Sequence, residues 1–187
     1  MFTQQSLGGG LASYSIRRLT NVDGLALADY FLQMSNQTKQ YFGPHPLDAD
    51  YAQKLCLPDQ MANDTDVRLV IVNQEEPSKI FGYFIVQVDV SENELCRYEE
   101  YGLPLAEGKV VSYAPSMAES MIGKGLGSQV FEIICKELIR LHYNTVVLMG
   151  GVQKRNTLAV HYYQKFGFKH VGSYYTEVEN LDMILQL

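Results

Sequence analysis

The chain has 187 residues, of which 15 are basic and 21 acidic, giving a formal net charge of −6. This length suits one domain, and 47% hydrophobic against 19% charged residues excludes a chain that is disordered throughout. The negative balance is atypical of nucleic-acid-binding proteins. No apolar run reaches the roughly 20 residues of a membrane-spanning helix, and residues 1–14 do not resemble a secretory signal. We therefore expect a cytoplasmic protein that binds neither nucleic acid nor membrane.

The first half of the chain predicts a leader, a strand, two helices and a hairpin. Residues 1–13 hold three consecutive glycines and little apolar periodicity, which predicts a flexible leader before a single domain over residues 14–187. The expected elements are, in order, a strand at 14–19, a helix around 25–32, a break at 41–46, a helix at 48–57, and strands at 67–72 and 80–90.

The second half has clearer patterns. Residues 91–107 predict a partly helical surface excursion. The elements that follow are a strand at 109–117, a helix at 125–142, a strand at 144–149, a helix at 156–165, and strands at 168–175 and 180–185. Pro115 cannot donate a hydrogen bond to a neighbouring strand, so it implies a sheet edge, a bulge or a local splay.

The three cysteines, Cys56, Cys96 and Cys135, are widely spaced. They form no CxxC pair and no zinc-like cluster with histidine, which favours reduced thiols over a metal or redox site. We expect no bound metal.

A glycine-rich turn joins the strand at 109–117 to the helix that follows. Alternating glycines let backbone N–H groups converge, and a helix start adds partial positive charge, so the turn suits a pyrophosphate. Its order differs from a Walker A loop and from the dinucleotide-binding fingerprint. Taken alone, the turn fits an ordinary helix start as well. It reads Ile122-Gly123-Lys124-Gly125-Leu126-Gly127-Ser128.

The helix at 156–165 places two polar side chains on one face. Asn156 and Tyr163 are seven residues apart, which is two helical turns, whereas Tyr162 is turned about 100° away and is assigned to the core. A phenol has a pKa of about 10 and can donate a proton at neutral pH. In isolation, Tyr163 also fits an ordinary residue of an amphipathic helix.

Together these two segments resemble the GNAT superfamily of acyl-CoA-dependent N-acetyltransferases. The family carries Q/R-x-x-G-x-G/A, matched by residues 122–127, and then N-x-x-A-x-x-x-Y-x-K-x-G-F, matched by residues 156–168. The likeness is specific over residues 109–187 and is a pattern of elements over residues 14–90. It implies an α+β fold with a mixed, mostly antiparallel sheet of six to seven strands, a splayed strand pair, and about four flanking helices.

The resemblance also implies a site for acetyl-CoA. Backbone groups at Ser116 and Met117 would pair with the pantetheine arm, and one N–H there would polarise the thioester. Asn156 would contact the arm, and Tyr163 would protonate the departing thiolate. Cofactor-binding residues in the turn would be Ile122, Gly123, Lys124, Gly125, Leu126, Gly127 and Ser128. Because Ile122 stands where the family has Gln or Arg, one side-chain contact to phosphate is missing.

The acceptor side is less defined by the sequence. Glu119, just beyond the strand at 109–117, is a candidate general base, and a water chain is an equal alternative. Tyr41, Phe42 and His45 in the Gly-Pro turn are candidates for the acceptor pocket, as is Tyr83 if its strand face lines the cleft. An exposed structural turn would explain His45 equally well.

The predicted function is transfer of acetyl from acetyl-CoA to a primary amine by direct attack, without an acyl-enzyme. The acceptor would be a small molecule or a peptide, and the protein a monomer or homodimer. A non-catalytic acyl-CoA-binding sensor is the alternative, kept open by Ile122 and by the unassigned base. A nucleotide phosphate-binding domain is disfavoured by the glycine order.

Overall fold

The computed structural model describes residues 2–8, 10 and 13–187, and the strands in them form one mixed sheet. The strand order is β1-β2-β3-β4-β5-β6-β9-β7, with β8 also paired to β9. All pairings are antiparallel except that of β5 with β6. The strands are β1 (Gln5–Ser6), β2 (Tyr14–Arg18), β3 (Val67–Asn73), β4 (Ile80–Gln87), β5 (Val110–Met117), β6 (Thr145–Leu148), β7 (Val152–Gln153), β8 (Lys169–Tyr175) and β9 (Glu179–Gln186).

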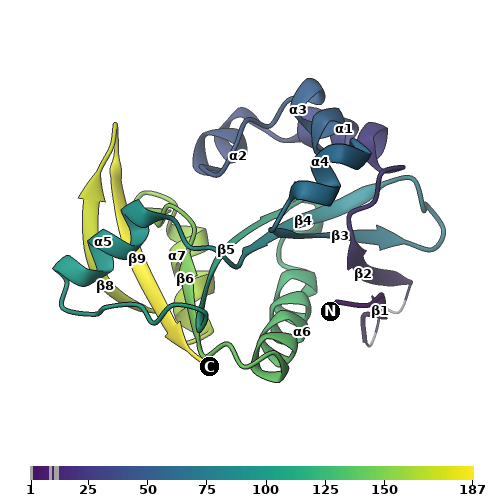
Figure 1. The fold of residues 1–187 in the computed structure, drawn as a ribbon. Helices are drawn as coiled ribbons and strands as arrows, with labels where there is room; N and C mark the ends of the chain where they lie inside the picture. Colours follow the sequence, from purple (N-terminus) through teal and green to yellow (C-terminus); the bar gives the residue numbers. More distant parts are fainter. Residues whose placement is uncertain (1, 9, 11–12) are drawn as a thin grey trace.

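Helices cover both faces of this sheet. Figure 1 shows α1–α4 on one side of the β2–β4 part and α6 on the other. Residues of α6 and α7 share one core cluster, residues of α1 and α3 share a second, and α5 forms a third with β5 and β6. The helices are α1 (Gly24–Gln33), α2 (Asn36–Tyr41), α3 (Ala49–Leu55), α4 (Pro58–Asn63), α5 (Glu92–Glu100), α6 (Leu126–Arg140) and α7 (Thr157–Lys165), with a short 3-10 helix η2 (Glu119–Met121).

The two parallel strands part at their carboxyl ends. The last paired residues of β5 and β6 are Tyr113 and Leu148, whereas β5 continues along β4 until Met117 pairs with Gly82. Pro115 lies in the stretch beyond the parting point, as a local splay would explain. The sheet is therefore split into two parts that share only the base of this pair (Figure 1).

The numbers of elements correct the prediction. Within the described residues the sheet has nine strands instead of six to seven, and there are seven α-helices instead of about four. The additional strands, β1 and β7, have two residues each, which is too short for a periodic pattern. The additional helices include α2 and α4, of six residues each, which begin at a Ser35 cap and at Pro58.

The predicted flexible leader differs from the structure where it is described. Gln5 and Ser6 form β1 and pair with β2. Phe2 and Leu7 are buried in the same core as α6. The leader prediction also covers residues 1, 9 and 11–12, which lie outside the described residues.

The segment 91–107 contains helix α5, which hydrogen bonds fix to strand β9. Ser91 caps this helix, the guanidinium of Arg97 donates to the buried carboxylate of Asp182 at 2.8 Å, and the Tyr98 hydroxyl donates to the Met183 carbonyl oxygen at 2.9 Å. Gly172 on β8 leaves room for the ring of Tyr101, which an added Cβ would strike.

In the part of the chain that the structure describes, no helix has the length and apolar character needed to cross a membrane.

Candidate active site

Hydrogen-bond alternation decides which backbone groups of β5 face the gap between β5 and β6. The N–H of Ala118 donates to Phe81 on the β4 side, and the N–H of Met149 donates to the Tyr113 carbonyl on the β6 side, both at 3.0 Å. Because directions alternate along an antiparallel strand, Tyr113, Pro115 and Met117 turn their backbone groups away from β4. Pro115 has no N–H, so among these three residues Met117 supplies the backbone N–H that faces the gap beyond the parting point.

Ser116 points its backbone the other way and has a structural role. Its side chain is buried, its hydroxyl donates to the Tyr83 carbonyl oxygen at 3.2 Å, and it lies 3.1 Å from the Tyr30 hydroxyl. Of the two residues predicted to meet the pantetheine arm, the geometry therefore favours Met117.

The glycine turn has the open, concave backbone that an anion site requires. Gly123 and Gly125 have φ angles of +79° and +82°, and a Cβ built at either meets no atom within 4 Å. Gly125 is the N-cap of the 15-residue helix α6, so the first N–H groups of that helix are directed at the turn. These features fit a diphosphate. The remaining positions, Leu126, Gly127 and Ser128, form the first turn of α6.

The side chains at the turn contribute less than its backbone. Ile122 is 46% exposed and supplies no polar group. The ammonium of Lys124 lies 3.8 Å from the Met121 sulfur and is the cation of the turn. Gly127 lies under the ring of Tyr162, whose hydroxyl donates to the Gly127 carbonyl oxygen at 2.9 Å.

Helix α7 brings Tyr163 to the same side of the sheet. Asn156 caps this helix, because its side-chain oxygen accepts from the N–H of Ala159 at 3.2 Å. Tyr162 and Tyr163 both pack in the α6 cluster, and Tyr163 is the more buried, so the assignment of Tyr162 alone to the core was incomplete. Burial raises the pKa of Tyr163 above its ordinary value near 10, which keeps the phenol protonated at neutral pH. Among the described residues, none forms a hydrogen bond with this hydroxyl.

Glu119 lies in η2 and contacts the start of α2. Its carboxylate accepts from the Thr38 hydroxyl at 3.1 Å and from the Ser35 N–H at 3.2 Å. These hydrogen bonds hold the pKa of Glu119 below its ordinary value, which makes it a weaker base.

The predicted acceptor residues divide into two groups. His45 and Tyr83 belong to a chain of hydrogen bonds beneath α1 and α3: Arg68 donates to the Tyr83 oxygen at 2.8 Å, and Tyr83 donates to His45 Nε2 at 3.1 Å. His45 Nδ1 then donates to the Pro46 carbonyl oxygen at 2.8 Å. Burial lowers the pKa of His45 to about 4, consistent with the neutral ring that this chain requires.

Tyr41 and Phe42 lie at the end of α2. The Arg155 guanidinium is 5.6 Å from the Tyr41 ring centroid, and the Gln153 side chain donates to the Gln40 carbonyl oxygen at 2.6 Å. Phe42 packs edge-on against His45. Helix α2 thus contacts η2 beyond β5 and the β7–α7 segment, so it spans the two parts of the split sheet.

Glu94 belongs to the segment 91–107 that the sequence predicts as a surface excursion, but the structure buries it. Its carboxylate is buried and accepts from the N–H of Gly150 at 2.9 Å and from the Ser112 hydroxyl at 3.2 Å. It therefore ties β5 to the turn after β6 at the point where these strands part. A Ser-x-x-Glu helix start at Ser91 was the available signal, but it cannot say what the glutamate meets.

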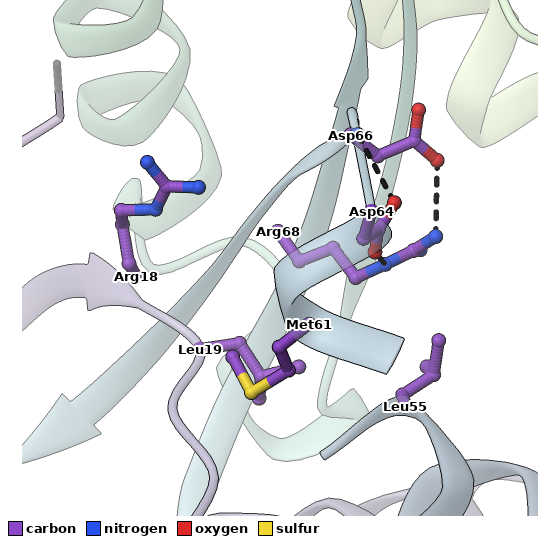
Figure 2. Close-up of a pocket in the computed structure, with 7 residues that line it drawn as sticks. All are labelled: Arg18, Leu19, Leu55, Met61, Asp64, Asp66 and Arg68. Carbon is purple, nitrogen blue, oxygen red and sulfur yellow. Dashed lines mark hydrogen bonds and ion pairs between the residues drawn. The ribbon is translucent and has the colours of Figure 1, made fainter. Parts of the chain in front are cut away.

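Two hollows lie away from the gap. The one in Figure 2, of about 50 Å³, holds the guanidinium of Arg68 between Asp64 and Asp66 at 2.6 and 3.0 Å. It has room for a few waters and is separated from β5 by β4. The second, of about 520 Å³, lies between α1 and the β3–β4 hairpin. Its lining includes Tyr30 and the carboxylates of Asp29, Glu75 and Glu76.

The comparisons with known proteins agree with this geometry. The model of the acetyltransferase (GNAT) family matches residues 39–168. The chain therefore belongs to this family and is an acyl-CoA-dependent N-acetyltransferase, with acetyl-CoA as its acyl donor. This confirms the resemblance found in the sequence. Among curated protein sequences, none matches the chain significantly.

Several solved structures share the fold. The ribosomal-protein-S5-alanine acetyltransferase from Vibrio fischeri superposes with a TM-score of 0.73 at 12% identity, over 99% of this chain and 97% of its own. An acetyltransferase of the GNAT family from Streptococcus pneumoniae gives 0.65 at 22% identity, over 93% and 99%. The aminoglycoside acetyltransferase AAC(6')-Ib in complex with coenzyme A gives 0.68 at 21% identity, over 93% and 95%. At such identities the likeness establishes the fold alone.

Proposed function

We propose that this enzyme transfers the acetyl group of acetyl-CoA to a primary amine by direct attack, with Tyr163 as the general acid. The observation that carries the proposal is the split between β5 and β6. One wall of the split presents the Met117 N–H, its open end leads into the glycine turn, and Tyr163 lies in the core on the α6 and α7 side.

Each part of this arrangement has a chemical task. Acetyl-CoA supplies an acyl group activated by its thioester. The N–H groups at Gly125, Gly127 and Ser128 hold the diphosphate, and the Met117 N–H donates to the thioester carbonyl oxygen. While the amine nitrogen bonds to the carbonyl carbon and the carbon–sulfur bond breaks, Tyr163 gives its proton to the leaving sulfur. Tyr163 then regains a proton from water, and the surplus proton of the amine also passes to water.

Glu119 is not the base in this proposal, because its hydrogen bonds to the start of α2 stabilise the charged carboxylate. The acceptor is an amine of a small molecule or of a peptide. Structures sharing the fold are named for both kinds, an aminoglycoside and a ribosomal-protein alanine.

The test combines turnover with binding. Wild-type protein is incubated with acetyl-CoA and one acceptor at a time. The acceptors are an aminoglycoside, an amino sugar, a peptide with a free N-terminus, and an N-terminally blocked peptide that contains lysine. Thiol release is followed in each, and CoA binding is measured by calorimetry. Amine-dependent release with at least one acceptor supports the proposal. Tight CoA binding without release on any amine would support the sensor instead.

A further inference from the structure

The turn that follows β6 is held by side chains from two other elements. The N–H of Gly151 donates to the Leu148 carbonyl oxygen at 3.0 Å, which closes the turn. The N–H of Gly150 donates to the carboxylate of Glu94 on α5 at 2.9 Å. The carbonyl oxygen of Gly150 accepts from the hydroxyl of Tyr174 on β8 at 2.5 Å. Both backbone hydrogen-bonding groups of Gly150 are therefore fixed by side chains.

This turn takes the chain away from β5. Gly150 and Gly151 have φ angles of +67° and +68°, in the left-handed region, where a strand cannot continue. They follow directly after the last pair of the two parallel strands, Tyr113 with Leu148. Beyond the turn the chain enters β7, which pairs with β9. The turn therefore begins the β6 wall of the gap.

Glu94 contacts both walls of the gap at the point where they part. Its side chain accepts from the Ser112 hydroxyl at 3.2 Å, one residue before the parting point of β5, and from Gly150, two residues after that of β6. Glu94 is only 3% exposed. Burying a carboxylate is costly unless hydrogen bonds compensate for the lost water, and here the compensating groups belong to the two parting strands.

Tyr174 is itself held in place through α5 and β9. The Arg97 guanidinium lies 4.0 Å from the centroid of the Tyr174 ring, and it donates to the buried carboxylate of Asp182 on β9 at 2.8 Å. Figure 1 shows α5 together with β8 and β9 on the β6 side of the gap, and α5 shares a core cluster with residues of β6, β8 and β9. The hydroxyl of Tyr174 is thus anchored before any cofactor binds.

We propose that Glu94 and Tyr174 are positioning residues, which hold the Gly150 turn away from β5 and so keep the gap open for the pantetheine arm. The inference rests on the proposed function and deepens it. A gap that is already open in the free protein binds the arm without first ordering its wall. When either side chain is lost, the turn occupies other conformations, and the affinity falls with the fraction of molecules whose gap is open.

The test separates the arm of CoA from its diphosphate. CoA and 3′-phospho-ADP, the part of CoA that carries the diphosphate but no pantetheine arm, are titrated by calorimetry into Glu94→Ala and Tyr174→Phe. Affinity for CoA should fall roughly five- to tenfold in each, the effect of one lost hydrogen bond. Affinity for 3′-phospho-ADP should stay at the wild-type value, because the glycine turn and α6 bind that part. Tyr174→Phe keeps the ring on Arg97 and removes only the hydroxyl, so it tests the inference even if Glu94→Ala does not fold.

Glu94→Gln tests whether the hydrogen bond or the charge matters. Its amide oxygen can still accept from the Gly150 N–H, and its amide nitrogen can donate to the Ser112 hydroxyl. Glu94→Gln should therefore restore CoA affinity and keep the wild-type kcat. Tyr98→Phe is the matched control, because the Tyr98 hydroxyl joins α5 to the Met183 carbonyl oxygen on β9 and not to the turn. It should lose stability and keep the wild-type ratio of the two affinities.

Three results would overturn the inference while leaving the proposed function in place. They are wild-type CoA affinity in Glu94→Ala and Tyr174→Phe, an equal loss of affinity for CoA and 3′-phospho-ADP in these variants, and a loss of kcat in Glu94→Gln at unchanged CoA affinity. If wild-type protein binds neither CoA nor 3′-phospho-ADP, the proposed function itself fails, and the role of both residues fails with it.

Discussion

Replacing Gly125 by glutamate should weaken CoA binding while leaving the fold intact. Gly125 has a φ angle of +82°, and an added Cβ meets no atom within 4 Å, so the new side chain is strained but not obstructed. The left-handed conformation costs a residue with a side chain about 1–2 kcal/mol. For a domain of this size, that corresponds to a melting temperature lower by about 2–8 °C.

The effect on binding is electrostatic as well as steric. A carboxylate about 6 Å from one unit of diphosphate charge costs about 0.7 kcal/mol at the dielectric constant of water and about 3 kcal/mol at an effective value of 20. CoA affinity should thus fall by a factor of about 3 to 150. The charge-dependent part of this loss should shrink as salt is added.

Gly102→Glu provides the matched control. Gly102 follows α5, has a φ angle of +72°, and also has open space around an added Cβ. It should lose similar stability and bind CoA as wild type does. The assay is calorimetric titration of CoA into both variants at low and high salt. Equal CoA affinities for Gly125→Glu and Gly102→Glu would refute the assignment of the turn as the diphosphate site.

The remaining predictions concern Tyr163, Gly172 and His45. Tyr163→Phe should lower kcat on the order of a hundredfold and leave the acetyl-CoA dissociation constant nearly unchanged. Steady-state kinetics measures the first and calorimetry the second, and an unaltered kcat would show that Tyr163 is not the general acid. Gly172→Ala places a methyl group in the ring of Tyr101 and should lower the free energy of unfolding by about 1–3 kcal/mol in urea denaturation. Gly43→Ala, with open space at its Cβ, should change it little, and similar values for the two variants would contradict the contact. Because the pKa of His45 is lowered to about 4, the unfolded chain takes up this proton near pH 6.5, before the folded protein does. The free energy of unfolding should fall as pH drops from about 6.5 toward 4, by at most about 1.4 kcal/mol per pH unit. His45→Gln should make this pH dependence weaker. Identical pH dependences for wild type and His45→Gln would show that His45 does not cause it.

The second half of the chain was predictable because its glycines and its helix cap fix local geometry. The left-handed Gly125 opens α6 and Asn156 caps α7. Gly167, with a φ angle of +89°, follows the end of α7. Of the three alternatives that Pro115 implies, a sheet edge, a bulge or a local splay, the splay agrees with the parting of β5 and β6. In each case, the feature depends on residues close together in sequence.

The remainder depends on contacts between distant segments. Alternation along the strand shows that Tyr83 points to one face of β4, but it could not say that this face lies under α1 and α3. Tyr83 and His45 therefore sit in a buried hydrogen-bond chain instead of lining an open pocket. Likewise, the sequence around Glu119 does not indicate that the Thr38 hydroxyl, far away along the chain, donates to its carboxylate.

The most direct test of the account is a crystal structure of the protein with acetyl-CoA. We expect diphosphate oxygens on the N–H groups of the Gly125–Ser128 segment, the pantetheine arm between β5 and β6, and the Met117 N–H bonded to it. A structure in which the arm lies outside the gap, with the Met117 N–H turned away from the ligand, would contradict the account.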